Sequence, residues 1–389
     1  MMTGENIVCF AKDWSEDPTS NNHVMRLLAR DNKVLWLNSI AMRTPSLGSK
    51  GDVAKIKQKL KSFVAGPTEV SDGLSVFTPL VLPFPYNPAA IIANRQILRA
   101  TVGLYRHQLE MGDFQLWTFL PTAVEYFGHM KESLRVYYCT DEWSGFSYLD
   151  SARISQMERR LMDMADIVFV TSRTLLETKS PFNKETHLAS HGVDFAHFAE
   201  SMKESTPIAP ELLGMKGPVL GFFGLIHDWI DLDLIAYLAE KRPEWNLVMI
   251  GKVAVDNTRY KHLSNIHWLG RKTYESLPSY CRGFTVGLIP FVLNELTRNV
   301  NPIKLREYLS AGLPVVSTNL PEVAHCQSLG WCDVGLDKDE FLQLCDKAIA
   351  EDTPAARKQR SDAMRAEDWD NKVAQIGSHI MRVKAQRAR

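Results

Sequence analysis

Short apolar runs alternate with stretches of helical periodicity along nearly the whole chain. In the first half, runs rich in β-branched and aromatic residues predict strands at Ile7–Ala11, Val34–Leu37, Leu74–Thr78, Gln115–Thr118, Arg135–Tyr138 and Ile167–Thr171. Apolar residues three and four positions apart predict helices between them, most clearly at His23–Ala29 and Arg153–Met164. Strands that alternate with helices are typical of a parallel α/β sheet.

The alternation pauses near the middle of the chain and then restarts. Residues 199–217 contain two prolines and two glycines without apolar periodicity, which predicts a linker. Beyond it we expect strands at Val219–Phe223, Leu247–Ile250, Ile266–Leu269, Val286–Phe291 and Val315–Ser317, and helices at Asp233–Lys241, Tyr274–Cys281 and Pro302–Ala311. Two Rossmann-like domains, residues 1–198 and 218–368, account for this pattern. We expect residues 369–389 to form a helix that packs back on the first domain.

Composition narrows the class of protein. The 389 residues exceed the roughly 150 typical of one domain, in agreement with two. The 45 basic and 45 acidic side chains cancel, so no global field attracts nucleic acid, and we expect no nucleic-acid partner. The six cysteines lack metal-binding spacing, and no apolar run has the length of a signal peptide or a membrane span. We therefore expect free thiols and a cytoplasmic location.

The most informative segment, residues 290–318, predicts a strand end, a polar loop, a helix and a further strand. Asn301 is a candidate ligand-binding residue and is expected to cap the helix, with Pro302 at its first position. A helix N-terminus at the carboxyl end of parallel strands favours an anion, because its N–H groups are unpaired. Lys304 is placed to neutralise a diphosphate, and Glu307 to accept hydrogen bonds from vicinal ribose hydroxyls.

This segment resembles the group 1 (glycogen-synthase-like) GT-B glycosyltransferases. Their Pro-x-Lys-x-x-Glu-Tyr-x-x-x-Gly-x-Pro-Val-Val pattern is matched by Pro302, Lys304, Glu307, Tyr308, Gly312, Pro314, Val315 and Val316. The resemblance implies an α/β GT-B fold, two Rossmann-like domains facing across a cleft, with Glu307 on the ribose of a nucleotide-diphosphate sugar. Asn299 stands where the family often has an earlier glutamate. The upstream Asn-x-Leu-Thr resembles a bacterial exopolysaccharide subset.

Two further segments resemble parts of the same family. Residues 219–233 look like its first strand and glycine turn, which places Gly224 where a backbone approaches a phosphate and His227 as a candidate donor ligand. The sequence His191-Gly-Val-Asp194 resembles the interdomain hinge, with histidine in place of asparagine.

Two Asp-x-Asp sequences have the letters of a glycosyltransferase metal motif. Asp231 and Asp233, like Asp337 and Asp339, stand where a helix needs an N-cap and an acidic first turn. We therefore assign no metal ligand and expect metal-independent chemistry without a cofactor, since the donor is a substrate.

The first domain offers two candidates for a catalytic base. Asp141 follows a strand, where a carboxylate facing the cleft accepts a proton from an acceptor hydroxyl, although it also fits a loop acid that caps the next segment. His23, which opens a helix, is the second candidate. Trp14 ends the first strand and can stack on a sugar or lipid headgroup. His23 and Trp14 also fit plain packing.

A basic amphipathic helix is predicted over Lys50–Val64, with five lysines and a regular apolar face. One interpretation is that this helix lies on an anionic membrane surface. The other is that it is an ordinary surface helix whose lysines are solvated. The apolar, proline-broken loop Leu80–Tyr86 is its natural companion on a membrane or around a lipid acceptor.

These patterns together predict a glycosyltransferase at the inner face of the cell membrane. It moves a sugar from a nucleotide-diphosphate donor to a glycan or lipid-linked acceptor in polysaccharide biosynthesis. Two alternatives remain. A non-hydrolysing nucleotide-sugar epimerase has the same architecture and needs no acceptor, and Asn299 in place of glutamate also fits an inert scaffold of a polysaccharide assembly complex.

Overall fold

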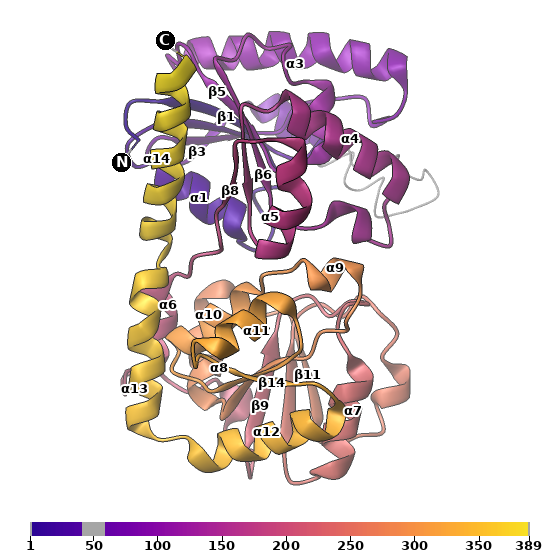
Figure 1. Ribbon diagram of the computed structural model, residues 1–389, viewed down its shortest axis with the longest axis vertical. Coiled ribbons are helices and arrows are strands. Elements are labelled where there is room, and N and C mark those ends of the chain that lie inside the picture. The colour runs from indigo at the N-terminus through magenta and orange to yellow at the C-terminus, as the bar shows by residue number, and fades with distance from the viewer. Residues whose placement is uncertain (1, 41–58, 388–389) are drawn as a thin grey trace. The chain divides into compact units, whose positions relative to one another are not determined.

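The computed structural model describes residues 2–40 and 59–387, which form two compact units (Figure 1). Unit 1 comprises Met1–Ser190 together with Lys372–Arg389, and unit 2 comprises His191–Asn371. Each unit is a mixed α/β body built on its own sheet. The expected pair of Rossmann-like domains is therefore confirmed.

Unit 1 contains a sheet in the order β3-β4-β2-β1-β5-β6-β7-β8, parallel except for the β3–β4 pair. The strands are β1 (Asn6–Phe10), β2 (Lys33–Leu37), β3 (Thr68–Ser71), β4 (Leu74–Phe77), β5 (Gln115–Thr118), β6 (Leu134–Cys139), β7 (Ile167–Val170) and β8 (Thr186–Leu188). Its helices include α1 (Ser20–Leu28), α3 (Pro88–Gln108), α4 (Ser151–Met164) and α5 (Arg173–Lys179). The last helix, α14 (Trp369–Arg387), runs mostly within unit 1.

All six strands expected in this half are confirmed, whereas β3, β8 and α3 were missed. Every residue of β3 is exposed, so the strand has no apolar alternation to reveal it. β8 has only three residues. α3 buries a stripe one residue wide (Ala90, Asn94, Leu98 and Val102), and one of these four is polar. Such a narrow stripe gives a weak helical signal.

Unit 2 has an all-parallel sheet in the order β11-β10-β9-β12-β13-β14. The strands are β9 (Val219–Phe223), β10 (Asn246–Ile250), β11 (Ile266–Gly270), β12 (Val286–Ile289), β13 (Val315–Thr318) and β14 (Asp333–Gly335). The helices are α6 (Phe195–Ala199), α7 (Leu232–Lys241), α8 (Leu277–Gly283), α9 (Glu295–Arg298), α10 (Ile303–Ser310), α11 (Pro321–Ser328), α12 (Lys338–Glu351) and α13 (Pro354–Ala363). The predicted strands are confirmed. The helix expected at Tyr274–Cys281 is a short 3₁₀ turn followed by α8.

Residues 199–217, predicted as a linker, belong instead to unit 2. Ala209 and Leu212 are buried in the core of that unit. The Ala209 N–H also donates to the carbonyl of Ser279 at 3.1 Å. The prolines and glycines of this segment therefore shape a packed loop, and the division between the units falls at Ser190 and His191.

Two further sequence expectations can be checked here. All six cysteines are buried and free, as expected. None of the helices among the described residues is long and apolar enough to cross a membrane. Most of the predicted basic helix Lys50–Val64 lies outside the described residues, and residues 59–65 are helical.

Candidate functional site

The loop between β12 and α10 carries the main motif of unit 2. α10 begins after Pro302, whose φ of −71° and ψ of 111° make it the N-cap, and no side chain caps the helix. The expectation that Asn301 caps the helix is wrong. Its Oδ1 accepts a hydrogen bond from Arg306 Nη1 at 2.9 Å, and the same guanidinium pairs with Glu367 at 3.0 Å. Because no side chain competes for the first amides of α10, they remain available to an anion.

Lys304 and Glu307 lie one turn apart on α10 without pairing. Among the described residues, neither side chain makes a hydrogen bond or a close ion pair, and Glu307 is only 7% exposed. Burial lowers the pKa of Lys304, against the opposing effect of Glu307. Burial also raises the pKa of Glu307 to about 7, although the Lys304 charge lowers it. The half-buried Lys304 ammonium lies 5.6 Å from the centre of the Phe222 ring. A buried carboxylate without a hydrogen-bond partner is costly, so the arrangement around Glu307 is typical of a site that waits for a ligand.

Gly224 gives Lys304 the room it occupies. The residue follows β9 with a φ of +140°, and a Cβ placed on it would lie 2.6 Å from Lys304 Cε. The Gly224 N–H donates to Ile250 O at 2.9 Å, so it does not point at a ligand. Gly251, which follows β10, also has a positive φ, and a Cβ placed on it would lie 1.8 Å from Gly224 O. The pair of glycine turns thus opens the carboxyl ends of β9 and β10 around the lysine.

The tyrosine of the motif is a packing residue. Tyr308 is fully buried and packs edge-on against Phe223, with ring centroids 4.8 Å apart. Its hydroxyl accepts a hydrogen bond from the Phe223 N–H at 3.2 Å. A Cβ on Gly287 would meet the Tyr308 ring at 2.6 Å. These contacts tie α10 to the sheet and so fix the position of Lys304 and Glu307.

Asp194 is a charge near this site that was missed in the sequence. It caps α6, where its Oδ1 accepts from His197 N at 3.2 Å, and its charge contributes to the raised pKa of Glu307. The segment was singled out as a hinge. Gly192 there packs against Trp369, whose ring a Cβ would meet at 2.7 Å. No local pattern reveals that the charge of a residue so distant in the chain acts on Glu307.

Asn299 has a buried oxygen without a partner. The side chain is 8% exposed, and its Nδ2 donates to Glu295 O at 2.8 Å. Its Oδ1 has no hydrogen-bond partner among the described residues. A buried amide oxygen left unsatisfied is costly, and a ligand hydroxyl would satisfy it.

His227 lies on the loop after β9. Its Nδ1 is 2.6 Å from Asp228 Oδ1, and its ring stacks on Trp229 with centroids 4.3 Å apart. Its Nε2 has no partner among the described residues, so its role as a donor ligand stays a prediction.

The two Asp-x-Asp sequences cap helices, as expected. Asp231 accepts from Leu234 N and Asp337 from Glu340 N, both at 2.8 Å. Asp233 bonds the Tyr260 hydroxyl, and Asp339 bonds that of Tyr237. Within the described ranges, no group of three potential ligand side chains gathers to hold a metal ion.

In unit 1 the carboxylates of Asp141 and Glu142 follow β6 but have different surroundings. Burial raises the pKa of Asp141, against a hydrogen bond from Thr140. Burial would also raise the pKa of Glu142, but the Lys179 ammonium, 2.8 Å from its carboxylate, outweighs that effect and lowers it. Lys179 also pairs with the buried Glu158 at 2.8 Å. Asp141 is therefore the better proton acceptor, and Glu142 belongs to an internal ion-pair network missed in the sequence.

His23 is buried in the first turn of α1, where its N–H donates to Thr19 O at 3.2 Å. Its proposed role as a base stays a prediction. The neighbouring Asn21 is also buried, and its Oδ1 has no partner among the described residues.

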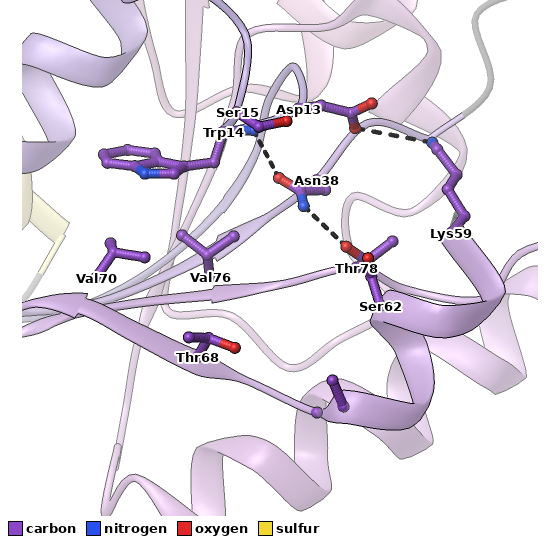
Figure 2. Close-up of a pocket in the computed structure, with 12 residues that line it drawn as sticks. Asp13, Trp14, Ser15, Asn38, Lys59, Ser62, Thr68, Val70, Val76 and Thr78 are labelled. Carbon is purple, nitrogen blue, oxygen red and sulfur yellow. Dashed lines mark hydrogen bonds and ion pairs between the residues drawn. The ribbon is translucent and has the colours of Figure 1, made fainter. Parts of the chain in front are cut away.

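A pocket of about 280 Å³ opens at the carboxyl ends of β1, β2 and β4 (Figure 2). Trp14, Val70 and Val76 form an apolar wall, and Trp14 rests edge-on against Trp36. The polar lining is held by hydrogen bonds between its members. Asn38 accepts from Trp14 N and donates to Thr78 Oγ1, both at 2.8 Å, and Lys59 lies 3.9 Å from Asp13. An apolar wall facing fixed polar groups suits a sugar ring.

Known proteins share features with this chain. Residues 217–347 match the family model described as glycosyl transferases group 1. A Bacillus subtilis (strain 168) protein named as a teichuronic acid biosynthesis glycosyltransferase, TuaH, is 25% identical over 260 residues. That match spans 62% of this chain and 65% of the relative, slightly less than two thirds of the relative's length.

Solved structures share the fold at low identity. Sucrose-phosphate synthase from Thermosynechococcus elongatus has a TM-score of 0.71 at 13% identity and covers 98% of this chain and 100% of its own. HepE of Anabaena, in complex with UDP-glucose, has a TM-score of 0.67 at 13% identity and covers 97% and 99%. These likenesses show the expected GT-B architecture. Residues 217–347 thus resemble the group 1 glycosyl transferases, and the chain as a whole has the GT-B fold of these solved structures.

Proposed function

We propose that the protein transfers a sugar from a nucleotide-diphosphate sugar to a glycan or lipid-linked acceptor in polysaccharide biosynthesis. The observation that carries the proposal is the placement of the half-buried Lys304 and the buried Glu307 one turn apart on α10, with no hydrogen bond or close ion pair to either side chain among the described residues. A diphosphate would neutralise the ammonium, and ribose hydroxyls would donate to the carboxylate. The HepE structure with UDP-glucose and the name of the Bacillus relative support this class of donor and pathway.

In this proposal the two units divide the substrates. Unit 2 holds the donor, with the α10 N-terminus and Lys304 stabilising the negative charge that develops on the leaving diphosphate. The orphan Asn299 Oδ1 accepts a hydrogen bond from a hydroxyl of the transferred sugar. Unit 1 binds the acceptor, with the pocket beside Trp14 as the sugar subsite, and Asp141 accepts the proton of the attacking hydroxyl.

A nucleotide screen tests the donor site directly. Uridine, guanosine, adenosine and thymidine diphosphates are added to the wild type and to Lys304→Met, and the melting temperature is recorded. At least one nucleotide should stabilise the wild type, and the variant should bind it about a hundredfold more weakly because it lacks the cation facing the diphosphate. A wild type that no nucleotide stabilises would contradict the proposal.

Sugar release from the matching nucleotide sugar then separates the transferase from the two alternatives. A transferase releases the nucleotide far faster when a lipid-linked or glycan acceptor is present. An epimerase converts the nucleotide sugar without any acceptor, and an inert scaffold binds the nucleotide without turnover.

Gly224→Ala tests whether the glycine turn makes room for Lys304. The new Cβ would displace the lysine, and the positive φ would strain the backbone, so we expect the free energy of unfolding to fall by about 1–3 kcal/mol and nucleotide affinity to fall as well. Gly214→Ala is the matched control, because Gly214 has a φ of +87° with no atom near its Cβ position. The control should lose stability and keep its affinity, as measured by denaturant unfolding and nucleotide titration. Equal affinities for the two variants would show that Gly224 does not act through Lys304.

A further inference from the structure

Exposed large apolar side chains are concentrated in one short part of unit 1. Leu80, Leu82 and Phe84 are 42–45% exposed and Ile92 is 59% exposed. We call these four residues the apolar ridge. All four fall within residues 80–92, in the loop that leads into α3 and in the first turns of that helix. A cluster of this kind, unlike single exposed leucines, is typical of an interaction surface.

The loop is rigidly built to present these side chains. Exposure alternates along it, because Leu80, Leu82 and Phe84 point outward while Val81 packs against the core and Pro85 is buried. Asn94, which is 1% exposed, holds the loop by two hydrogen bonds, one from Leu82 N at 2.7 Å and one to Leu82 O at 2.9 Å. The outward direction is therefore fixed by buried contacts.

The segment that carries the ridge has charged side chains of one sign only. Residues 73–109 contain no aspartate or glutamate, in a chain with 45 acidic residues, and they include three arginines. Two of these are used internally, since Arg95 pairs with Glu125 and Arg106 bonds backbone carbonyls. Arg99 is exposed without a carboxylate partner among the described residues, two helical turns after Ile92 and hence on the same side of α3.

We propose that the apolar ridge docks unit 1 on an anionic lipid bilayer. Leucine and phenylalanine side chains enter the boundary between headgroups and acyl chains, while Arg99 meets the phosphates. The absence of acidic side chains from residues 73–109 favours an anionic lipid surface. The Asp150 carboxylate, which acts on the neighbouring Tyr86, is paired with Arg153 at 3.2 Å. This site goes beyond donor binding, since the docking needs no nucleotide.

Vesicle co-sedimentation of the full chain tests the docking. The vesicles contain phosphatidylcholine alone or phosphatidylcholine with phosphatidylglycerol. The wild type should partition about fivefold better onto the anionic vesicles, and added salt should weaken this binding. The double variant Leu82→Ser/Phe84→Ser should lose at least about tenfold in partitioning, because two apolar side chains no longer leave water. Arg99→Gln should weaken binding to anionic vesicles only.

A variant of exposed leucines in unit 2 and measurements of stability serve as controls for the vesicle experiment. Leu329→Ser/Leu336→Ser removes two exposed leucines of unit 2, 51% and 70% exposed, and should bind vesicles like the wild type. All variants should keep the wild-type melting temperature and nucleotide affinity, so failure here is distinct from failure of the donor site. Wild-type protein that ignores both vesicles would overturn the proposal. So would a Leu82→Ser/Phe84→Ser variant that binds as tightly as the wild type, or equal binding to both lipid compositions.

Discussion

Glu307→Gln should weaken nucleotide binding by at least about a hundredfold and at the same time stabilise the ligand-free protein above pH 7. Loss of affinity follows because an ionised carboxylate accepts hydrogen bonds of about 1.5–3 kcal/mol each, and the amide loses both the charge and one acceptor oxygen. Stability rises because Glu307 is buried without a bonded partner among the described residues. Opposite effects on binding and stability are typical of a group retained for function.

The pH dependence of this carboxylate has a definite sign. Burial raises the Glu307 pKa to about 7, from an ordinary value of 4.5 that applies in the unfolded chain. Between these values the native state holds more protons than the unfolded state, so the contribution of Glu307 to stability falls as pH rises through this window. The full effect above pH 7 is about 3 kcal/mol. Glu307→Gln should remove this slope from the unfolding free energy.

Nucleotide affinity should change with pH in the opposite direction. Hydroxyl donors need the ionised carboxylate, so the wild type should bind a nucleotide sugar more tightly as pH rises toward and past about 7, with release of a proton. Calorimetry in buffers of different ionisation enthalpy measures the proton released. A Glu307→Gln variant with wild-type affinity, or proton release that persists in it, would exclude Glu307 from the nucleotide site.

The donor motif could be predicted from sequence because its geometry is local. Strand β12, the loop and α10 follow one another along the chain, and a spacing of three residues places Lys304 and Glu307 on one side of a helix. Gly224 was found for a related reason, since a glycine directly after a strand marks a turn. Its structural role differs from the expected one, because it makes room for Lys304 while its N–H bonds Ile250.

Contacts between distant segments could not be predicted in this way. The charge of Asp194, at the start of α6, contributes to the raised pKa of Glu307 on α10. Lys179 forms an ion pair with Glu142 although no sequence pattern links the two positions. The cap of α10 was predicted wrongly for a similar reason. Asn301 is a good N-cap by type, but the Arg306 guanidinium binds its side-chain oxygen. A local propensity is overridden wherever a packed side chain offers a competing partner.

Asp141→Asn should reduce sugar transfer by about a thousandfold and leave nucleotide binding unchanged. A general base contributes about 10²–10⁴ to the rate, and the asparagine amide cannot accept the proton. Burial raises the pKa of Asp141, so transfer by the wild type should fall as pH drops and this carboxylate becomes protonated. Steady-state transfer and nucleotide titration on the same preparations measure the two effects separately.

Glu142→Gln is the matched control for Asp141, since it alters the adjacent carboxylate. Glu142 pairs with the buried Lys179, which keeps its second pair with Glu158, so the loss of the Glu142 carboxylate should lower the free energy of unfolding by about 1.5–3 kcal/mol. Folded Glu142→Gln protein should still transfer sugar at a rate near that of the wild type. In the wild type the Glu142 carboxylate is bound to Lys179 and does not take the proton, so its removal leaves the base in place. Turnover that survives in Asp141→Asn would remove Asp141 from the mechanism and leave His23 as the base to test. Loss of turnover in both variants, with both proteins folded under the assay conditions, would show instead that the loop after β6 as a whole positions the acceptor, and no single carboxylate acts as the base.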